Sequence, residues 1–381
     1  MYSILILGTG TQGLAMIQAL KKAECHVVLL YGEKNNYADL SRFTDKKYRF
    51  IGDTESNDYL KEIRSIIEKE HIDVIIPMGD KSANFLSCHK EELSQNARFD
   101  TPDYEHFLRG YDKNQLMSLC QHKGYPHPKT LDLSKCEIDT NEELKSFTYP
   151  AMLKPNCTTG GRGMIKINDY NELRDKYPEL HKHYGDYHLQ QFIKPGGRQV
   201  KVQLYVNHDK NLVASSVIEK RRWYPVQGGS NCCAVTIKDD SLVDMCYNIM
   251  LDLNWLGFAD FDLIEEPDTH QLFVMEINPR VPACIKSPIV AGLNWGQVFV
   301  DSSLRVSKHE YNYKEGVVLR HLGFDILWFL KSPNRWKSEP SWFKFFGKNV
   351  YYQDMSSWTD PLPFWCGTWN NIKKLFTGHG K

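Results

Sequence analysis

The stretch from Tyr149 to Ile167, YPAMLKPNCTTGGRGMIKI, constrains the fold of this chain more than any other. It predicts a short buried strand ending at Lys154 and Pro155, a polar glycine-rich turn, and a second strand from Met164. Glycines let backbone N–H groups approach a phosphate closely, and a lysine at the end of the strand adds positive charge there. The stretch therefore predicts a β-hairpin whose tip covers phosphates, with an ordinary surface hairpin as the alternative.

Two apolar stretches about a hundred residues further on carry isolated acidic and amide groups. They are Gly257–Leu263, GFADFDL, and Phe273–Arg280, FVMEINPR. Both predict strands, and Glu276 and Asn278 share a face because they lie two residues apart. With Asp262 they would offer three hard oxygen ligands, the kind that Mg²⁺ prefers. The alternative is a set of polar residues at strand ends.

Together, the lysine-proline strand, its glycine-rich turn, the acidic strand and the MEINPR segment resemble the ATP-grasp superfamily of carboxylate-amine ligases. The pattern resembles carbamoyl-phosphate-synthase-like or D-amino-acid-ligase-like members of this superfamily. The resemblance covers about residues 101–308 and implies ATP and Mg²⁺ as cofactors, with Mn²⁺ as a substitute. The metal ligands that it implies are Asp262, Glu276 and Asn278.

The resemblance also implies residues that contact the nucleotide and the reacting groups. The nucleotide contacts are Lys113, Lys154, Thr159, Gly160, Gly161, Gly163, Gln190, Gln191 and Ile193. The catalytic cations are Arg280, Lys220 and Arg221. Many family members carry Glu where this chain has Gln190 or Gln191, which leaves the purine preference open. The run Lys220–Arg222, at the predicted end of a strand that begins at Leu212, has a solvated turn as its alternative.

Lys113 has a separate argument from helix electrostatics. Asp112 is a plausible N-cap, which puts Lys113 in the first helical turn. A cation there opposes the helix macrodipole, so Lys113 needs an anionic partner. Further upstream, Asp80 follows a predicted strand, Asp73–Pro77, and either caps the next helix or faces the substrate.

The N-terminus has the pattern of a dinucleotide-binding βαβ unit. Ser3–Leu7 predicts a strand, Gly8–Gly13 reads GTGTQG, and Glu33 stands near the expected acidic position after a second strand. A nicotinamide-dependent oxidoreductase is therefore an alternative function. The same opening is also found in the N-terminal domains of many ATP-grasp enzymes, where the glycine loop carries no dinucleotide.

Charge and cysteine content narrow the class of protein. The 47 basic and 47 acidic side chains balance, so no global field attracts nucleic acid. The ten cysteines show no metal-type spacing, and no stretch is typical of a signal peptide or a membrane span. These features predict a soluble cytoplasmic protein with reduced thiols, without excluding a homodimer.

The sequence therefore predicts an α/β protein with a Rossmann-like parallel-sheet domain and an ATP-grasp fold, built from a lid subdomain and a mixed or antiparallel sheet subdomain. The predicted boundaries are 1–105, 106–190, 191–310 and an aromatic-rich tail, 311–381. The predicted reaction joins a small-molecule carboxylate to an amine through an acyl-phosphate, with an amino acid or an envelope precursor as substrate. A non-catalytic nucleotide-binding protein is another alternative. The tail mixes aromatic and basic residues, so it either packs on the core or contacts an anionic membrane.

Overall fold

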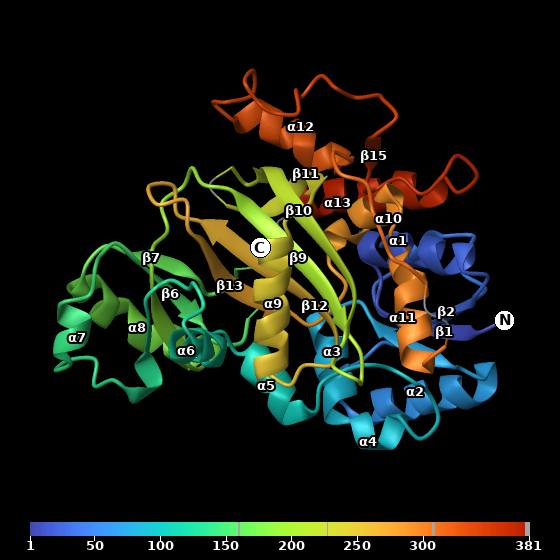
Figure 1. Cartoon of the computed structure of the whole chain (residues 1–381), viewed down its shortest axis with the longest axis horizontal. Helices are drawn as coiled ribbons and strands as arrows, with labels where there is room; N and C mark the ends of the chain where they lie inside the picture. The colour runs from blue at the N-terminus through green and yellow to red at the C-terminus, as the bar shows by residue number, and fades with distance from the viewer. Residues whose placement is uncertain (159–160, 227, 307–308, 378–381) are drawn as a thin grey trace. The chain divides into compact units, whose positions relative to one another are not determined.

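The structure is a computed structural model of the whole chain (Figure 1), and it forms two compact units. Unit 1 contains Met1–Tyr104, Val200–Asp260 and Asn278–Lys381, and unit 2 contains Glu105–Gln199 and Phe261–Ile277. The residues that the structure describes are 1–158, 161–226, 228–306 and 309–377.

A four-stranded parallel sheet opens unit 1, in the order β3-β2-β1-β4. This arrangement confirms the predicted Rossmann-like N-terminal sheet. The strands β1, β2 and β4 are buried runs rich in Val, Ile and Leu, as expected for a parallel sheet covered on both faces, whereas the edge strand β3 is mostly exposed. The strands are β1 (Ser3–Leu7), β2 (His26–Tyr31), β3 (Lys46–Arg49) and β4 (Val74–Pro77).

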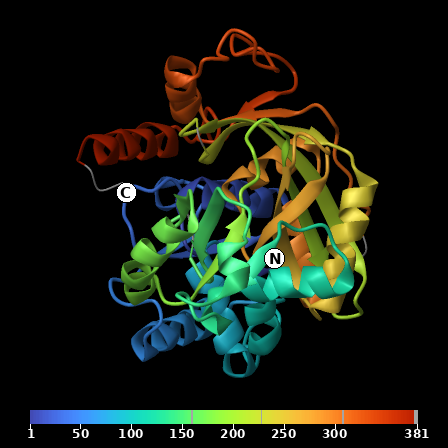
Figure 2. The same cartoon turned by 90° about the vertical axis from the view of Figure 1, so that its left-hand side faces the viewer.

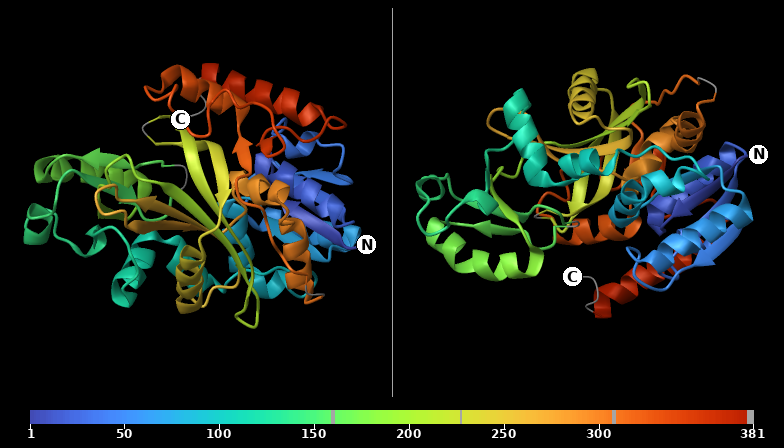
Figure 3. Two further views of the ribbon diagram at one scale, coloured as in Figure 1. Left: turned by 45° about the horizontal axis from the view of Figure 1, so that its top comes forward. Right: turned by 90° about the horizontal axis from the view of Figure 1, so that it is seen from below.

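Alternate residues of these strands belong to two separate cores. Ile4 and Ile6 pack in one cluster with α1 and α11, whereas Leu5 and Leu7 pack in another with α2 and α3 (Figures 1 and 3). The period of two that governs strand side chains thus gives each face its own helical layer. The helices are α1 (Gly10–Lys22), α2 (Asn57–Glu70), α3 (Asp80–Cys88), α4 (Lys90–Leu93) and α11 (Trp295–Leu304).

Unit 2 is built on an antiparallel sheet in the order β5-β8-β6-β7. Its strands are β5 (Thr130–Asp132), β6 (Ala151–Pro155), β7 (Ile165–Ile167) and β8 (Tyr187–Gln191). The pairing of β6 with β7 confirms the predicted hairpin. The helices that accompany this sheet are α5 (Tyr104–Tyr111), α6 (Lys113–Lys123), α7 (Glu142–Lys145) and α8 (Tyr170–Tyr184).

The third sheet has seven strands in the order β13-β12-β9-β10-β11-β14-β15. It is mixed, as predicted, because β10 pairs antiparallel with β11 while β14 pairs parallel with β15. Helix α9 (Asp240–Asp252) packs against β10 (Figure 2). The strands are β9 (Gln199–Val206), β10 (Leu212–Tyr224), β11 (Ser230–Ile237), β12 (Gly257–Glu265), β13 (Leu272–Asn278), β14 (Val318–Arg320) and β15 (Val350–Tyr352).

The last part of unit 1 contains α10 (Lys286–Ala291), α12 (Leu322–Lys331) and α13 (Leu362–Thr377). Aromatic side chains of this tail stack on one another, with Phe329 and Trp342 only 4.0 Å apart between ring centroids. Across the described ranges, no helix has both the length and the apolar character needed to span a bilayer.

Candidate functional site

Lys154 is the central cation of the site residues in unit 2. It occupies the buried end of β6, where its Nζ donates a 2.5 Å hydrogen bond to Oε1 of Gln190 on β8. Burial lowers the pKa of Lys154 to about 8, while the carboxylate of Glu276 acts in the opposite direction and Lys113 reinforces the decrease. The ammonium is thus held rigidly in a poorly hydrated position.

Lys113 has the anionic partner that helix electrostatics predicted. Asp112 is the N-cap of α6 and accepts a hydrogen bond from the Gln115 amide, so Lys113 is the first residue of the helix. Its Nζ lies 3.4 Å from Oε2 of Glu276 and donates to the Thr158 carbonyl at 2.8 Å. The lysine therefore joins the β13 carboxylate to the base of the glycine hairpin.

His188 adds a buried polar group that the sequence reasoning missed. Its Nδ1 lies 2.8 Å from Oδ1 of Asn156, and its Nε2 has no hydrogen-bond partner among the described residues. Burial lowers the pKa of His188 well below its usual value, and the nearby Lys154 and Lys113 disfavour its protonation further. The imidazole is therefore neutral. His188 and Gln190 stand two apart on a buried strand, and this alternation was the available signal.

Within unit 2, the cluster of Lys113, Lys154 and Glu276 combines two buried lysines with one carboxylate. The Glu276 side chain is 34% exposed, whereas that of Lys113 is 9% exposed. Two ammonium groups against a single carboxylate leave an excess of positive charge in a region of low dielectric. Such a cluster is suited to an anion that brings several oxygen acceptors, and phosphate groups have this chemistry.

The tip of the hairpin lies partly outside the described residues, since Thr159 and Gly160 are not among them. Gly161 and Gly163 both adopt left-handed φ values, +72° and +73°. They differ in surroundings. A Cβ on Gly163 would come within 3.0 Å of Pro155, Tyr184 and Tyr187, whereas among the described residues a Cβ on Gly161 would meet only the Met164 sulfur, at 4.0 Å. Gly163 therefore serves packing, and Gly161 is the open position.

The residues predicted to contact adenine lie on or just beyond β8. The Gln190 side chain is already engaged by Lys154 and by Thr130, whose hydroxyl accepts its amide N–H at 3.1 Å. The backbone N–H of Gln191 donates to the Lys129 carbonyl at 2.8 Å. Ile193 lies two residues past the end of β8 and is half-buried. Of these groups, the Gln190 amide therefore orients Lys154 in this structure.

The site residues of unit 1 centre on Asp260, which is fully buried. Lys201 donates a 2.6 Å hydrogen bond to Oδ2 of Asp260, and the side-chain amide of Asn278 donates to the same residue at 3.3 and 3.4 Å. The sequence reasoning singled out Asp262 on this strand and missed both Asp260 and Lys201. Asp260 and Asp262 lie two residues apart on β12, and Lys201 and Gln203 lie two apart on β9, so the members of each pair share a face of their strand. This spacing was again the available sequence signal.

Arg280 connects this network to the N-terminal sheet of unit 1. Its Nη2 donates to Oδ1 of Asn278 at 3.1 Å, and its Nε lies 3.5 Å from Oδ1 of Asp80. The prediction that Asp80 caps α3 is wrong, because Gly79 is the N-cap and its amide bonds the Ser82 hydroxyl. Because the Ser82 hydroxyl already bonds the backbone of the N-cap residue, Asp80 is not needed as a cap. Its carboxylate faces the guanidinium of Arg280 instead.

Lys220 and Arg221 lie within a strand and not at its end. The strand β10 continues to Tyr224, so the predicted end at Glu219 is wrong. The register shifts on both sides of Arg222, whose side chain is fully buried against Asp325 at 2.7 and 2.9 Å. Arg221 lies 3.3 Å from Glu219. The strand can continue through this run of cations because Asp325, which is remote in sequence, pairs with the buried Arg222. The local sequence does not indicate such a partner.

Backbone amides of the Gly8–Gly13 loop donate hydrogen bonds to other parts of the same chain. The amide of Gly8 donates to the Leu30 carbonyl and that of Gly10 to the Asn36 carbonyl, both at 2.9 Å. The Thr9 hydroxyl also donates to Asn36. Two of the amides that would face a dinucleotide pyrophosphate are therefore already used, and the oxidoreductase alternative is not favoured.

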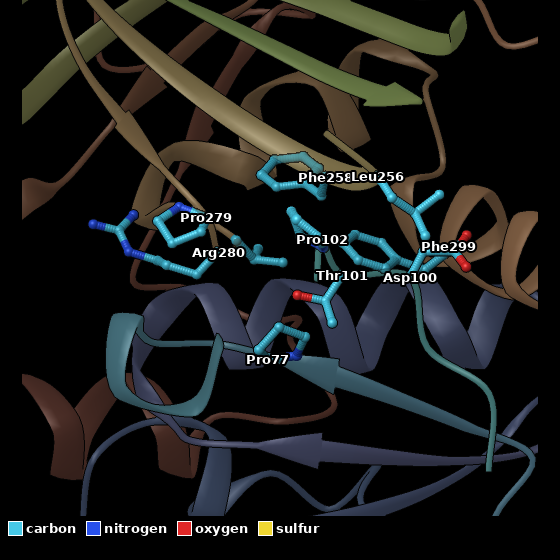
Figure 4. A pocket seen from close by; sticks show the side chains of 10 residues that line it. Pro77, Asp100, Thr101, Pro102, Leu256, Phe258, Pro279, Arg280 and Phe299 are labelled. Atoms are coloured by element: carbon cyan, nitrogen blue, oxygen red, sulfur yellow. The ribbon is translucent and has the colours of Figure 1, made fainter. Parts of the chain in front are cut away.

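A small pocket in unit 1 lies beside Arg280 (Figure 4). Its walls are mostly apolar and include Pro77, Phe258 and Phe299. Figure 4 shows the guanidinium of Arg280 pointing away from the other lining side chains. The pocket thus packs the stem of this arginine and leaves its charged head to Asn278 and Asp80.

Comparison with known proteins identifies this architecture. The model of the ATP-grasp domain matches residues 111–284, and that of the PylC-like N-terminal domain matches residues 4–97. The class defined by fold and site is an α/β protein with a glycine hairpin lid and an acidic strand pair. The chain thus contains an ATP-grasp domain and a PylC-like N-terminal domain.

Curated relatives are distant and longer than the matched region. A D-aspartate ligase from Enterococcus faecium is 25% identical over 227 residues, which cover 54% of this chain and 53% of that protein. A carbamoyl phosphate synthase large chain, C-terminal section, from Methanopyrus kandleri is 23% identical over 230 residues, covering 58% of this chain and 42% of the relative. The chain thus spans about half the length of these relatives.

Solved structures share the fold at low identity. An N5-carboxyaminoimidazole synthetase from Staphylococcus aureus has a TM-score of 0.68 at 16% identity and covers 87% of this chain and 86% of that one. An L-amino acid ligase from Bacillus licheniformis has a TM-score of 0.64 at 14% identity, covering 84% and 78%. These likenesses concern the fold alone.

Proposed function

We propose that this protein is an ATP-dependent ligase that joins a carboxylate to an amine through an acyl-phosphate intermediate. The observation that carries the proposal is the cluster of the buried Lys113 and Lys154 with the partly exposed Glu276, beside a glycine hairpin in unit 2. Its excess positive charge suits nucleotide phosphates. The similarity to a D-aspartate ligase favours an amino acid or an amino-acid-containing envelope precursor as substrate.

The donor chemistry of β12 and β13 fits Mg²⁺. No cluster of three or more His, Cys, Asp or Glu occurs in the described part of the chain, but two carboxylates with one amide need no such cluster. Glu276 is partly exposed, and the Asn278 amide is oriented by Asp260 and Arg280 with its oxygen toward the guanidinium. Of the predicted ligands, Asp262 and Glu276 both lie in unit 2 and would hold the ion, which when bound offsets the negative charge of phosphate oxygens.

In this proposal the chain's own cations perform separate tasks. Lys154 and Lys113 hold phosphate oxygens, with Lys154 kept in place by Gln190. Arg280, positioned by Asp80, holds the substrate carboxylate as it is phosphorylated. Lys220 and Arg221 face the phosphates or the acceptor. The hairpin excludes water, because an acyl-phosphate exposed to water would hydrolyse before the amine attacks.

A coupled screen tests the proposal. ADP and phosphate release should be measured over pairs of amino acids and over envelope precursors with a free carboxylate or amine. We expect release only when both a carboxylate and an amine are present. Release of equal size with ATP alone, or tight NAD binding without ATP binding, would overturn the assignment.

The first prediction concerns the metal set. Glu276→Gln should lower ADP formation by on the order of a hundredfold and shift its Mg²⁺ dependence, because the residue serves charge and not the core. Its melting temperature should stay close to that of the wild type. Glu179→Gln, an exposed position on α8 of the same unit, is the matched control and should keep full turnover. Unchanged turnover in Glu276→Gln would exclude this ligand set.

A further inference from the structure

The tail of unit 1 exposes large apolar side chains that the proposed reaction does not use. Trp336 is 71% exposed and Phe346 is 90% exposed, and both lie in the loop between α12 and β15. A second group lies around α13, where Trp358 is fully exposed and Leu362, Trp365 and Trp369 are mostly exposed. Such a concentration of exposed aromatic rings indicates an interaction surface. We name it the tail surface, made of Leu330, Trp336, Phe343, Phe346, Trp358, Leu362, Trp365 and Trp369.

The aromatic rings of the loop between α12 and β15, here called the loop rings, pack on an inner layer of aromatic side chains. Phe329 stacks on Trp342 and makes edge contacts with Trp336 and Phe343, while Trp336 stacks on Phe343 with 5.8 Å between centroids. The inner ring of Trp342 donates its Nε1–H to the Asp325 carbonyl at 3.0 Å. The outer rings are therefore presented by a packed inner layer, and their exposure is a fixed feature of the fold.

Helix α13 exposes its own apolar stripe. Leu362, Trp365 and Trp369 recur at intervals of three and four, so they lie on one helical face. The opposite face packs on the N-terminal domain, where Gly367 approaches the ring of Tyr37. Figures 1 to 3 show α12 and α13 near each other, so the loop rings and the stripe lie in the same region of unit 1.

The charges around the loop are mostly positive. Between residues 331 and 348 the chain has five basic side chains and a single acidic one, Glu339. The lysines are all exposed and Arg335 is half-buried. The basic residues are Lys331, Arg335, Lys337, Lys344 and Lys348. The rings therefore lie among solvated cations, which an anionic surface would attract.

We propose that the tail surface docks on an anionic lipid bilayer. Tryptophans prefer the headgroup region of a membrane, and lysines next to it are attracted to anionic lipid. The exposed aromatic rings would suit a protein partner as well, but the surrounding lysines favour the bilayer, because lysine is depleted in protein interfaces. The contact is peripheral, since in the described residues no helix could span the membrane. The proposal goes beyond the ligase reaction and would bring the enzyme to a lipid-linked or membrane-proximal substrate.

Vesicle co-sedimentation of the full chain tests this proposal. We expect binding to phosphatidylcholine–phosphatidylglycerol vesicles that decreases with added salt, and little binding to phosphatidylcholine alone. The triple change of Lys337, Lys344 and Lys348 to Glu should lower partitioning by on the order of a hundredfold. The matched control changes three exposed lysines elsewhere in unit 1 to Glu, namely Lys22, Lys46 and Lys314.

A second variant tests how much the exposed aromatic rings contribute to vesicle binding. Trp336→Ser with Phe346→Ser should lower vesicle binding on the order of tenfold even at high salt, because it removes apolar contact and not charge. ATP-Mg binding should be unchanged in every variant, so a failure here is distinguishable from a failure of the ligase proposal. The membrane assignment would be overturned if the wild type did not bind vesicles or bound them independently of salt, or if the control variant lost as much vesicle binding as the Lys337, Lys344 and Lys348 variant. It would also be overturned if the wild type were a dimer that the Trp336 and Phe346 changes convert to a monomer.

Discussion

At the residue scale, the most informative group is the buried ammonium of Lys154. Its pKa is lowered to about 8, first by burial. Below that pH the lysine carries the charge that a phosphate needs, and the charge is lost as the pH rises through 8. A bound phosphate would raise this pKa again, so ATP binding above pH 8 takes up a proton.

The second prediction follows from this titration. ATP affinity should fall on the order of tenfold between pH 7 and pH 9, because only about one Lys154 in ten is protonated at pH 9. Calorimetry in buffers of different ionisation enthalpy would measure both affinity and proton uptake. Lys154→Arg, which stays charged at both values, should bind with a nearly flat profile. A wild-type profile as flat as that of the arginine variant would exclude Lys154 as the phosphate contact.

The sequence predicted some of these residues and not their partners. Lys113 could be predicted to need an anion because a helix start disfavours a cation, and the partner is Glu276. Asp260 and Lys201 could not be predicted as a pair, since they lie on separate strands and form a buried ion pair only through sheet order. Local pattern indicates which residues share a face but not which strands become neighbours.

At the element scale, Gly161 and Gly163 of the glycine hairpin have different roles, because only Gly163 is tightly packed. Its strands and their antiparallel pairing were predictable from apolar runs around Lys154 and the glycines. The different surroundings of Gly161 and Gly163 were not, because both read as members of the same GGRG run. Only the folded chain brings Pro155 and Tyr187 against Gly163.

The third prediction uses this difference. Gly161→Val strains the backbone at its φ of +72°, and it should in addition weaken ATP binding, because the new side chain obstructs backbone approach to phosphates. Gly163→Val should mainly destabilise unit 2 through steric overlap. The matched control is Gly185→Val, which has a similar φ of +77° and open space at the end of α8. Equal ATP affinity in the Gly161 and Gly185 variants would leave the hairpin without a nucleotide role.

At the scale of the whole molecule, the N-terminal sheet and the tail differ in how far they follow from sequence. The buried strands and the fingerprint loop predict the parallel sheet directly, and the structure confirms it. The tail folds back through contacts that are remote in sequence. Arg222 on β10 and Arg320 on β14 share the carboxylate of Asp325 on α12, and all three side chains are almost completely buried. No local pattern connects an arginine to an aspartate a hundred residues away.

The last prediction tests whether this cluster holds the tail in place. Asp325→Asn leaves two buried guanidinium groups without their shared carboxylate, which should destabilise unit 1 by about 3–5 kcal/mol in urea denaturation. The loop should also become sensitive to proteolysis, because Arg222 bonds the Pro340 carbonyl and Arg320 bonds the Lys344 carbonyl. Asp58→Asn, which removes an exposed ion pair on α2, should change neither readout. A stable, protease-resistant Asp325→Asn variant would mean that the aromatic packing alone anchors the tail.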